Sequence, residues 1–172
     1  DDLVTGVQTC ALPILATASL ANAVYQLGQQ VGLVTNARDA ADRVRTEGIQ
    51  REFRTRELAR DTAQATSKAD RLRPVMVETR RGAEQFQRIR EVLARAELTD
   101  GLTMSQLVFE SASRLPRDAS VVAVLPGATE ETALALGSLR RRGFAVLAVV
   151  VLPDDDTRDD IGRLMAAGIE VR

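Results

Sequence analysis

The sequence predicts an α/β fold, a three-layer sandwich in which helices cover a doubly wound, mostly parallel sheet. The hydrophobic content of 45% beside 27% charged residues is typical of a globular domain. The length of 172 residues is enough for one domain with a core. Two apolar, β-branched runs, at 120–125 and 144–152, flank a segment with Leu134, Leu136 and Leu139 at helical spacing. This order predicts a βαβ unit with a parallel pair of strands.

Capping residues delimit the helices of this C-terminal part. Thr129 is a suitable N-cap, and Arg140–Arg142 follow at the helix end, where cations are favoured; we prefer this explanation to a phosphate site. The pattern then predicts a helix over 157–167 and an edge strand over 169–171. The acidic residues before and within its first turn fit a helix start better than a cation cluster; they are Asp154, Asp155, Asp156, Asp159 and Asp160.

The N-terminal half has weaker signals. The apolar spacing in 16–29 predicts a helix that ends at Gly28, and a buried strand follows over 31–35, closed by Asn36. Residues 37–73 are rich in charged and polar side chains with few apolar positions. We interpret this stretch as a solvated helical insertion.

A second strand is predicted over 75–79, followed by a turn that contains Arg80 and Arg81. Because this turn presents its side chains between a strand and a helix, Arg80 and Arg81 are candidate interaction residues, although we prefer the simpler explanation of a plain polar turn. The helix that follows has an apolar stripe made of Phe86, Ile89, Val92, Leu93 and Ala96. Thr103 and Gln106 then form a capping-box pattern, which predicts a helix from about Met104 to Arg114.

The composition excludes several kinds of chemistry and partner. The chain has 23 basic and 24 acidic residues, no histidine, and one cysteine, Cys10. Histidine bases, Ser-His-Asp triads and Cys/His zinc sites are therefore unavailable, and the balanced charge favours neither nucleic acid nor an anionic membrane. The longest apolar run, 144–152, is about half the length of a transmembrane helix. We expect a protein without enzymatic activity and without membrane contact in this chain.

The first residues are interpreted separately from the rest of the chain. The eleven residues Val4–Ile14, VTGVQTCALPI, match one reading frame of a short-read sequencing adapter residue for residue. We therefore interpret residues 1–14 as a non-native segment and residues 15–172 as one truncated domain, the back part of a longer protein.

Four stretches carry a resemblance to a known family: ASLANAVYQLGQQVGLVTN, RPVMVETRRG, LARAELTDGLT and LPRDASVVAVLPGATEETALALGSLRRRGFAV. The chain resembles the bacterial family called domain of unknown function 58, over nearly all of residues 15–172. The resemblance implies a von Willebrand factor A-like, Rossmann-like fold, typically placed behind a membrane-anchored region. It also implies a cytoplasmic domain that is encoded beside a MoxR-type AAA+ ATPase.

The resemblance further implies a divalent-cation site in the complete parent, with Mg²⁺ as a possible ligand. The first strand and its Asp-x-Ser-x-Ser loop would precede residue 15, so the chain lacks its first central strand and the principal ligands. Thr103 stands at the second ligand position, but helix capping explains it without any absent residue. At the third ligand position, residues 125–127 offer Leu-Pro-Gly and no carboxylate. We expect no cofactor in this fragment.

These features lead to two functional hypotheses. The first is a non-enzymatic interaction module, an adaptor or partner of a MoxR-type ATPase in envelope or complex assembly. The alternative is a small-molecule or cation-dependent ligand binder at the carboxyl ends of the strands, near Asn36, Pro126 and Pro153. In the family's strand order the absent strand would lie between 31–35 and 120–125. Unpaired edges there predict marginal stability or aggregation.

Overall fold

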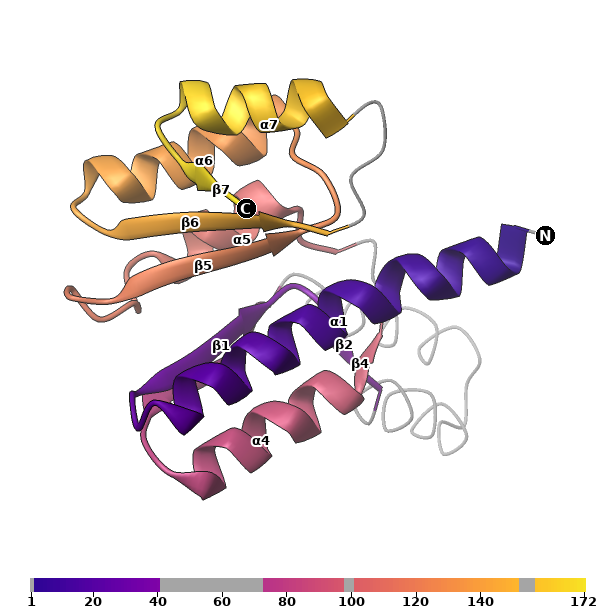
Figure 1. The fold of residues 1–172 in the computed structure, drawn as a ribbon, viewed down its shortest axis with the longest axis vertical. Helices are drawn as coiled ribbons and strands as arrows, with labels where there is room; N and C mark the ends of the chain where they lie inside the picture. The colour runs from indigo at the N-terminus through magenta and orange to yellow at the C-terminus, as the bar shows by residue number, and fades with distance from the viewer. Residues whose placement is uncertain (1, 41–72, 98–100, 152–156) are drawn as a thin grey trace, which may run out of the picture.

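The computed structural model describes residues 2–40, 73–97, 101–151 and 157–172 (Figure 1). These residues form five helices and three small sheets, which confirms the α/β class. They do not form the single doubly wound sheet that the sequence predicts, because the strands divide among three sheets. Strand β1 (Val31–Thr35) pairs with β3 (Val75–Arg80), and β2 (Arg38–Asp39) pairs with β4 (Ala96–Glu97). The third sheet consists of β5 (Ser120–Leu125), β6 (Ala145–Val150) and β7 (Glu170–Val171). None of the described helices is both long and apolar enough to span a bilayer.

The C-terminal part contains the predicted βαβ unit. Strand β5 (Ser120–Leu125) leads through helix α6 (Glu130–Arg141) into β6 (Ala145–Val150), and the two strands pair in parallel from Ser120 opposite Ala145 to Leu125 opposite Val150. Helix α7 (Thr157–Ala166) then leads to β7 (Glu170–Val171), which is also parallel to β6. The sequence therefore predicted this part correctly.

One face of this sheet carries the larger hydrophobic core. Ala123, Leu125 and Ala148 pack there against buried residues in or next to the helices α5 (Met104–Ser111), α6 and α7, namely Val108, Ala112, Ala133, Ala135, Leu136, Leu139 and Leu164. The predicted stripe on α6 is partly wrong, since Leu134 is 56% exposed. Leu134 and Leu136 are two positions apart, which places them on nearly opposite sides of the helix.

The other face of the same sheet is apolar and only partly covered. Residues alternate between the two faces of a strand, and the register sets Val122 beside Leu147 and Val124 beside Val149 on this second face. Val122 is 44% exposed, and the other three side chains are partly exposed. Within the described part of the chain, these four residues belong to neither hydrophobic core.

The N-terminal part departs further from prediction. Helix α1 (Asp2–Gln26) begins well before residue 16 and includes Pro13, so residues 2–14 are helical. Strand β1 (Val31–Thr35) pairs with β3 (Val75–Arg80) in antiparallel fashion, where the sequence had suggested a mostly parallel arrangement. Thr35, the last residue of β1, lies opposite Val75, the first residue of β3, so the chain leaves β1 and enters β3 at the same end of the sheet. Neighbouring strands connected in this way are antiparallel.

A second, smaller core joins helices α1 and α4 to this strand pair. Helix α4 (Ala83–Ala94) contributes buried residues from its predicted apolar stripe, and the core consists of Ala21, Leu33, Val77, Ile89 and Leu93. The rings of Tyr25 and Phe86 stack between the two helices with centroids 5.3 Å apart. Ala96, predicted as the last residue of the stripe, instead starts strand β4 (Ala96–Glu97), which pairs with β2 (Arg38–Asp39).

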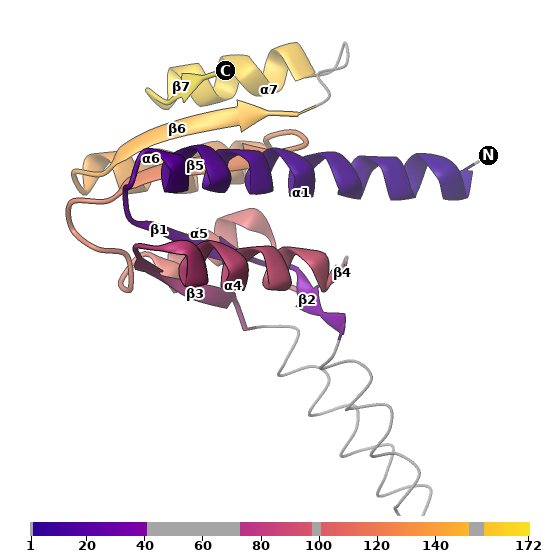
Figure 2. The same cartoon turned by 60° about the horizontal axis from the view of Figure 1, so that its bottom comes forward.

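Helix α1 lies along the boundary between the two parts, where it contacts α4, β1 and β5 (Figures 1 and 2). Strands β1 and β5 are not hydrogen-bonded to each other in the residues described. Most of the predicted insertion, residues 41–72, lies outside the described residues. The adapter origin of residues 1–14 and the domain limits are not tested by the fold and remain predictions.

Candidate functional site

The carboxyl-end edge of the parallel strands is the candidate site. Strands β5 and β6 both end there, at Leu125 and Val150, and open α/β sheets bind their ligands outside the carboxyl ends of such parallel strands. Residues 126–129 form the loop from β5 to α6. Pro153, which the sequence analysis predicted beside Asn36 and Pro126 at a ligand site, lies outside the described residues.

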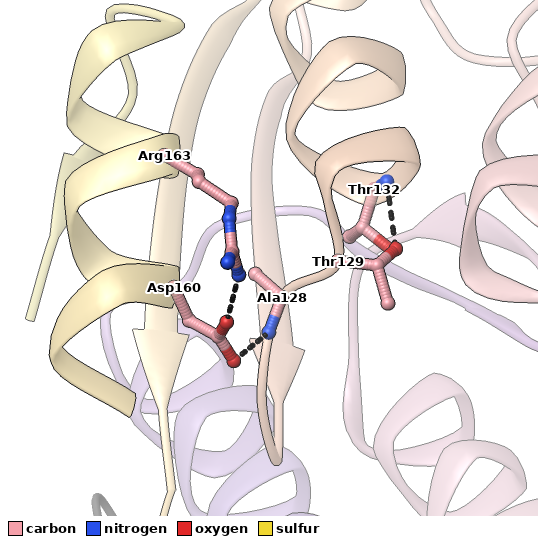
Figure 3. A network of polar contacts seen from close by, with 5 residues as sticks. All are labelled: Ala128, Thr129, Thr132, Asp160 and Arg163. Atoms are coloured by element: carbon pink, nitrogen blue, oxygen red, sulfur yellow. Dashed lines mark hydrogen bonds and ion pairs between the residues drawn. The ribbon is translucent and has the colours of Figure 1, made fainter. Parts of the chain in front are cut away.

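A hydrogen bond to helix α7 holds this β5–α6 loop (Figure 3). The backbone N–H of Ala128 donates to Oδ2 of Asp160 at 2.8 Å, and the other carboxylate oxygen, Oδ1, accepts from Nη1 of Arg163 at 2.5 Å. Ala128 is 1% exposed, so its N–H needs a partner within the protein. A Cβ at Gly127 would lie 2.9 Å from Oδ2 of Asp160, so glycine allows the carboxylate to approach.

The start of helix α6 is fixed independently. The side chain of Thr129 accepts a hydrogen bond from the backbone N–H of Thr132 at 3.2 Å, which confirms Thr129 as the N-cap (Figure 3). The contacts of Asp160 at the first turn of α7 are structural. The other predicted acidic residues, Asp154–Asp156, lie outside the described part of the chain.

The capping box predicted at Thr103 is confirmed. Thr103 caps helix α5 (Met104–Ser111): its N–H donates to Oε1 of Gln106 at 3.0 Å, and its Oγ1 accepts from the Gln106 N–H at 3.3 Å. The same Oγ1 lies 2.9 Å from Oγ of Ser105. The helix ends three residues before the predicted Arg114.

Among the residues that the structure describes, no set of ligands for a divalent cation surrounds Thr103. Such ions need several oxygen ligands, including carboxylates. The hydroxyl of Thr103 is already engaged in the capping box, and the described residues bring no group of three or more acidic, histidine or cysteine side chains together. A cation role for Thr103 therefore stays a prediction about the complete parent.

Asn36, which follows strand β1 of a separate sheet, also has a structural contact. Its Nδ2 donates to the carbonyl oxygen of Leu102 at 2.8 Å, which ties the end of β1 to the residue before Thr103. The sequence marked Asn36 as the residue that closes the strand, but not this partner, which is 66 positions away. The sequence also did not reveal the partner of the Asp160 carboxylate, the N–H of Ala128, which is 32 positions away.

The interaction candidates Arg80 and Arg81 lie away from this edge. Arg80 is the last residue of β3 and not part of the turn, and it stands opposite Val31 at the beginning of β1. Its Nη2 pairs with Oε2 of Glu78 at 2.9 Å, and both side chains are exposed. Arg81 is exposed between β3 and α4. The structure thus places both arginines at the amino end of β1, opposite the site described above.

Comparisons of the chain with protein-family models, curated proteins and solved structures find no match.

Proposed function

We propose that the protein is a non-enzymatic interaction module whose carboxyl-end edge binds a protein partner. The observation that carries this proposal is the use of the polar side chains that follow strand β1 or lie at the starts of helices α5 and α7. Asn36, Thr103 and Asp160 all hold backbone groups of loops or helix starts. Because these side chains are engaged in structural hydrogen bonds, they keep the loops in a fixed shape. Loops of fixed shape suit recognition of a partner more than proton transfer or nucleophilic attack.

The class of partner comes from the family resemblance. We propose a MoxR-type AAA+ ATPase, with this protein as its cytoplasmic adaptor in envelope or complex assembly. The balanced charge of the chain, with 23 basic and 24 acidic residues, supports a protein partner over a polyanion such as nucleic acid.

A direct binding measurement tests this function. The 172-residue chain would be immobilised and exposed to a purified MoxR-type ATPase from the same organism, loaded with a non-hydrolysable ATP analogue. We expect saturable binding that an unrelated AAA+ ATPase does not reproduce. The absence of binding by a folded chain would overturn the proposed partner.

A further inference from the structure

We propose that Asp160 is a positioning residue that holds the loop Pro126–Thr129 in the conformation that the protein partner recognises. The inference rests on the proposed function, because it assigns a role to one side chain at the same edge. The two oxygens of this carboxylate have separate partners. Oδ1 pairs with Arg163 on the same helix, and Oδ2 accepts the N–H of Ala128 in the loop.

The contacts of the loop explain why Asp160 controls its shape. The loop begins where β5 ends at Leu125 and ends at Thr129, the N-cap of α6, so both of its ends are fixed by regular structure. Between them, Asp160 holds the N–H of Ala128 from a different helix, α7. The middle of the loop is therefore attached to the next βα unit.

Burial along the loop shows which part can meet a partner. Ala128 is buried, whereas Pro126 is exposed and Gly127 is partly exposed. The hydrogen bond at Ala128 thus anchors the buried part of the loop, while residues 126 and 127 remain accessible to a partner. A loop that is already held in its bound shape loses less conformational entropy on association. Loss of the anchor should therefore weaken binding without removing any contact with the partner.

Three substitutions separate the loop contact from the ion pair. Asp160→Ala removes both, Asp160→Asn keeps an oxygen that can accept the Ala128 N–H, and Arg163→Met removes the ion pair alone. We expect Asp160→Ala to weaken binding of the ATPase about tenfold, the effect of losing one buried hydrogen bond. Asp160→Asn and Arg163→Met should change the dissociation constant less than about twofold, because exposed ion pairs contribute little.

Two further variants make the test specific. Gly127→Ala keeps Asp160 but places a Cβ 2.9 Å from its Oδ2, so it should weaken binding as Asp160→Ala does. Glu170→Ala removes the exposed ion pair with Arg172 on β7 and should leave binding unchanged. Circular dichroism melting would show that each variant is folded.

The outcomes distinguish this inference from the function on which it rests. If the wild-type chain binds the ATPase and folded Asp160→Ala binds equally well, the positioning role is wrong and the proposed function stands. Equal weakening by Asp160→Ala, Asp160→Asn and Arg163→Met would also overturn it, because the ion pair would then be the cause. If the folded wild-type chain does not bind, both proposals fall.

Discussion

Gln85 shows how one buried side chain links a helix to both strands of a pair. It lies on α4, is 4% exposed, and its Nε2 donates to the carbonyl oxygen of Val31 at 2.8 Å and to that of Glu78 at 2.6 Å. Val31 is in β1 and Glu78 is in β3. The amide therefore connects both strands to the first turn of the helix.

Replacement of Gln85 by leucine should destabilise the protein. Leucine fills a similar space but cannot donate a hydrogen bond, so the carbonyl groups of Val31 and Glu78 both lose the hydrogen bond from this buried amide. We expect the free energy of unfolding to fall by about 2 kcal/mol, measured by urea denaturation. The matched control is Gln87→Leu on the same helix, whose exposed side chain bonds to Glu91. A control loss as large as that of Gln85→Leu would contradict this account.

At the level of single elements, the start of helix α5 tests the two readings of Thr103. Thr103→Ala removes the hydroxyl that accepts the Gln106 N–H, so we expect a loss of about 1 kcal/mol in the free energy of unfolding. Thr103→Ser keeps the hydroxyl and should retain most of this stability. Thermal melting with and without Mg²⁺ provides the measurement. A stabilisation of the wild-type chain by Mg²⁺ that Thr103→Ala abolishes would favour the cation reading instead.

The elements that the sequence predicted well are those with local signals. The strands at 120–125 and 145–150 are continuous apolar runs, and the caps at Thr103 and Thr129 depend on residues three positions away. The antiparallel pairing of β1 with β3 depends on how the chain returns after residue 40, which no local pattern specifies. Contacts of the candidate site were missed for the same reason, since Asn36 and Asp160 bond to distant backbone groups.

For the whole molecule, the partly covered face of the β5–β6 pair affects behaviour in solution. Parallel sheets are normally covered on both faces. Here one face carries the larger core, while Val122, Val124, Leu147 and Val149 form an apolar patch on the other. Strand β5 is also hydrogen-bonded only to β6 in the described residues, so its second edge has no partner strand. An apolar face beside an unpaired apolar edge favours association between copies.

We therefore expect the chain to self-associate as its concentration rises, and a charge in the patch to reduce this. Val122→Lys places a charge at the most exposed of the four positions, which is 44% exposed and can keep the ammonium group in water. The control is Leu134→Lys, the same charge change at a residue of α6 that is 56% exposed. Sedimentation velocity over a concentration series should show larger species for the wild type and Leu134→Lys than for Val122→Lys. A wild-type chain that stays monomeric and unfolds cooperatively on heating would contradict this expectation, because the patch would then be tolerated in water.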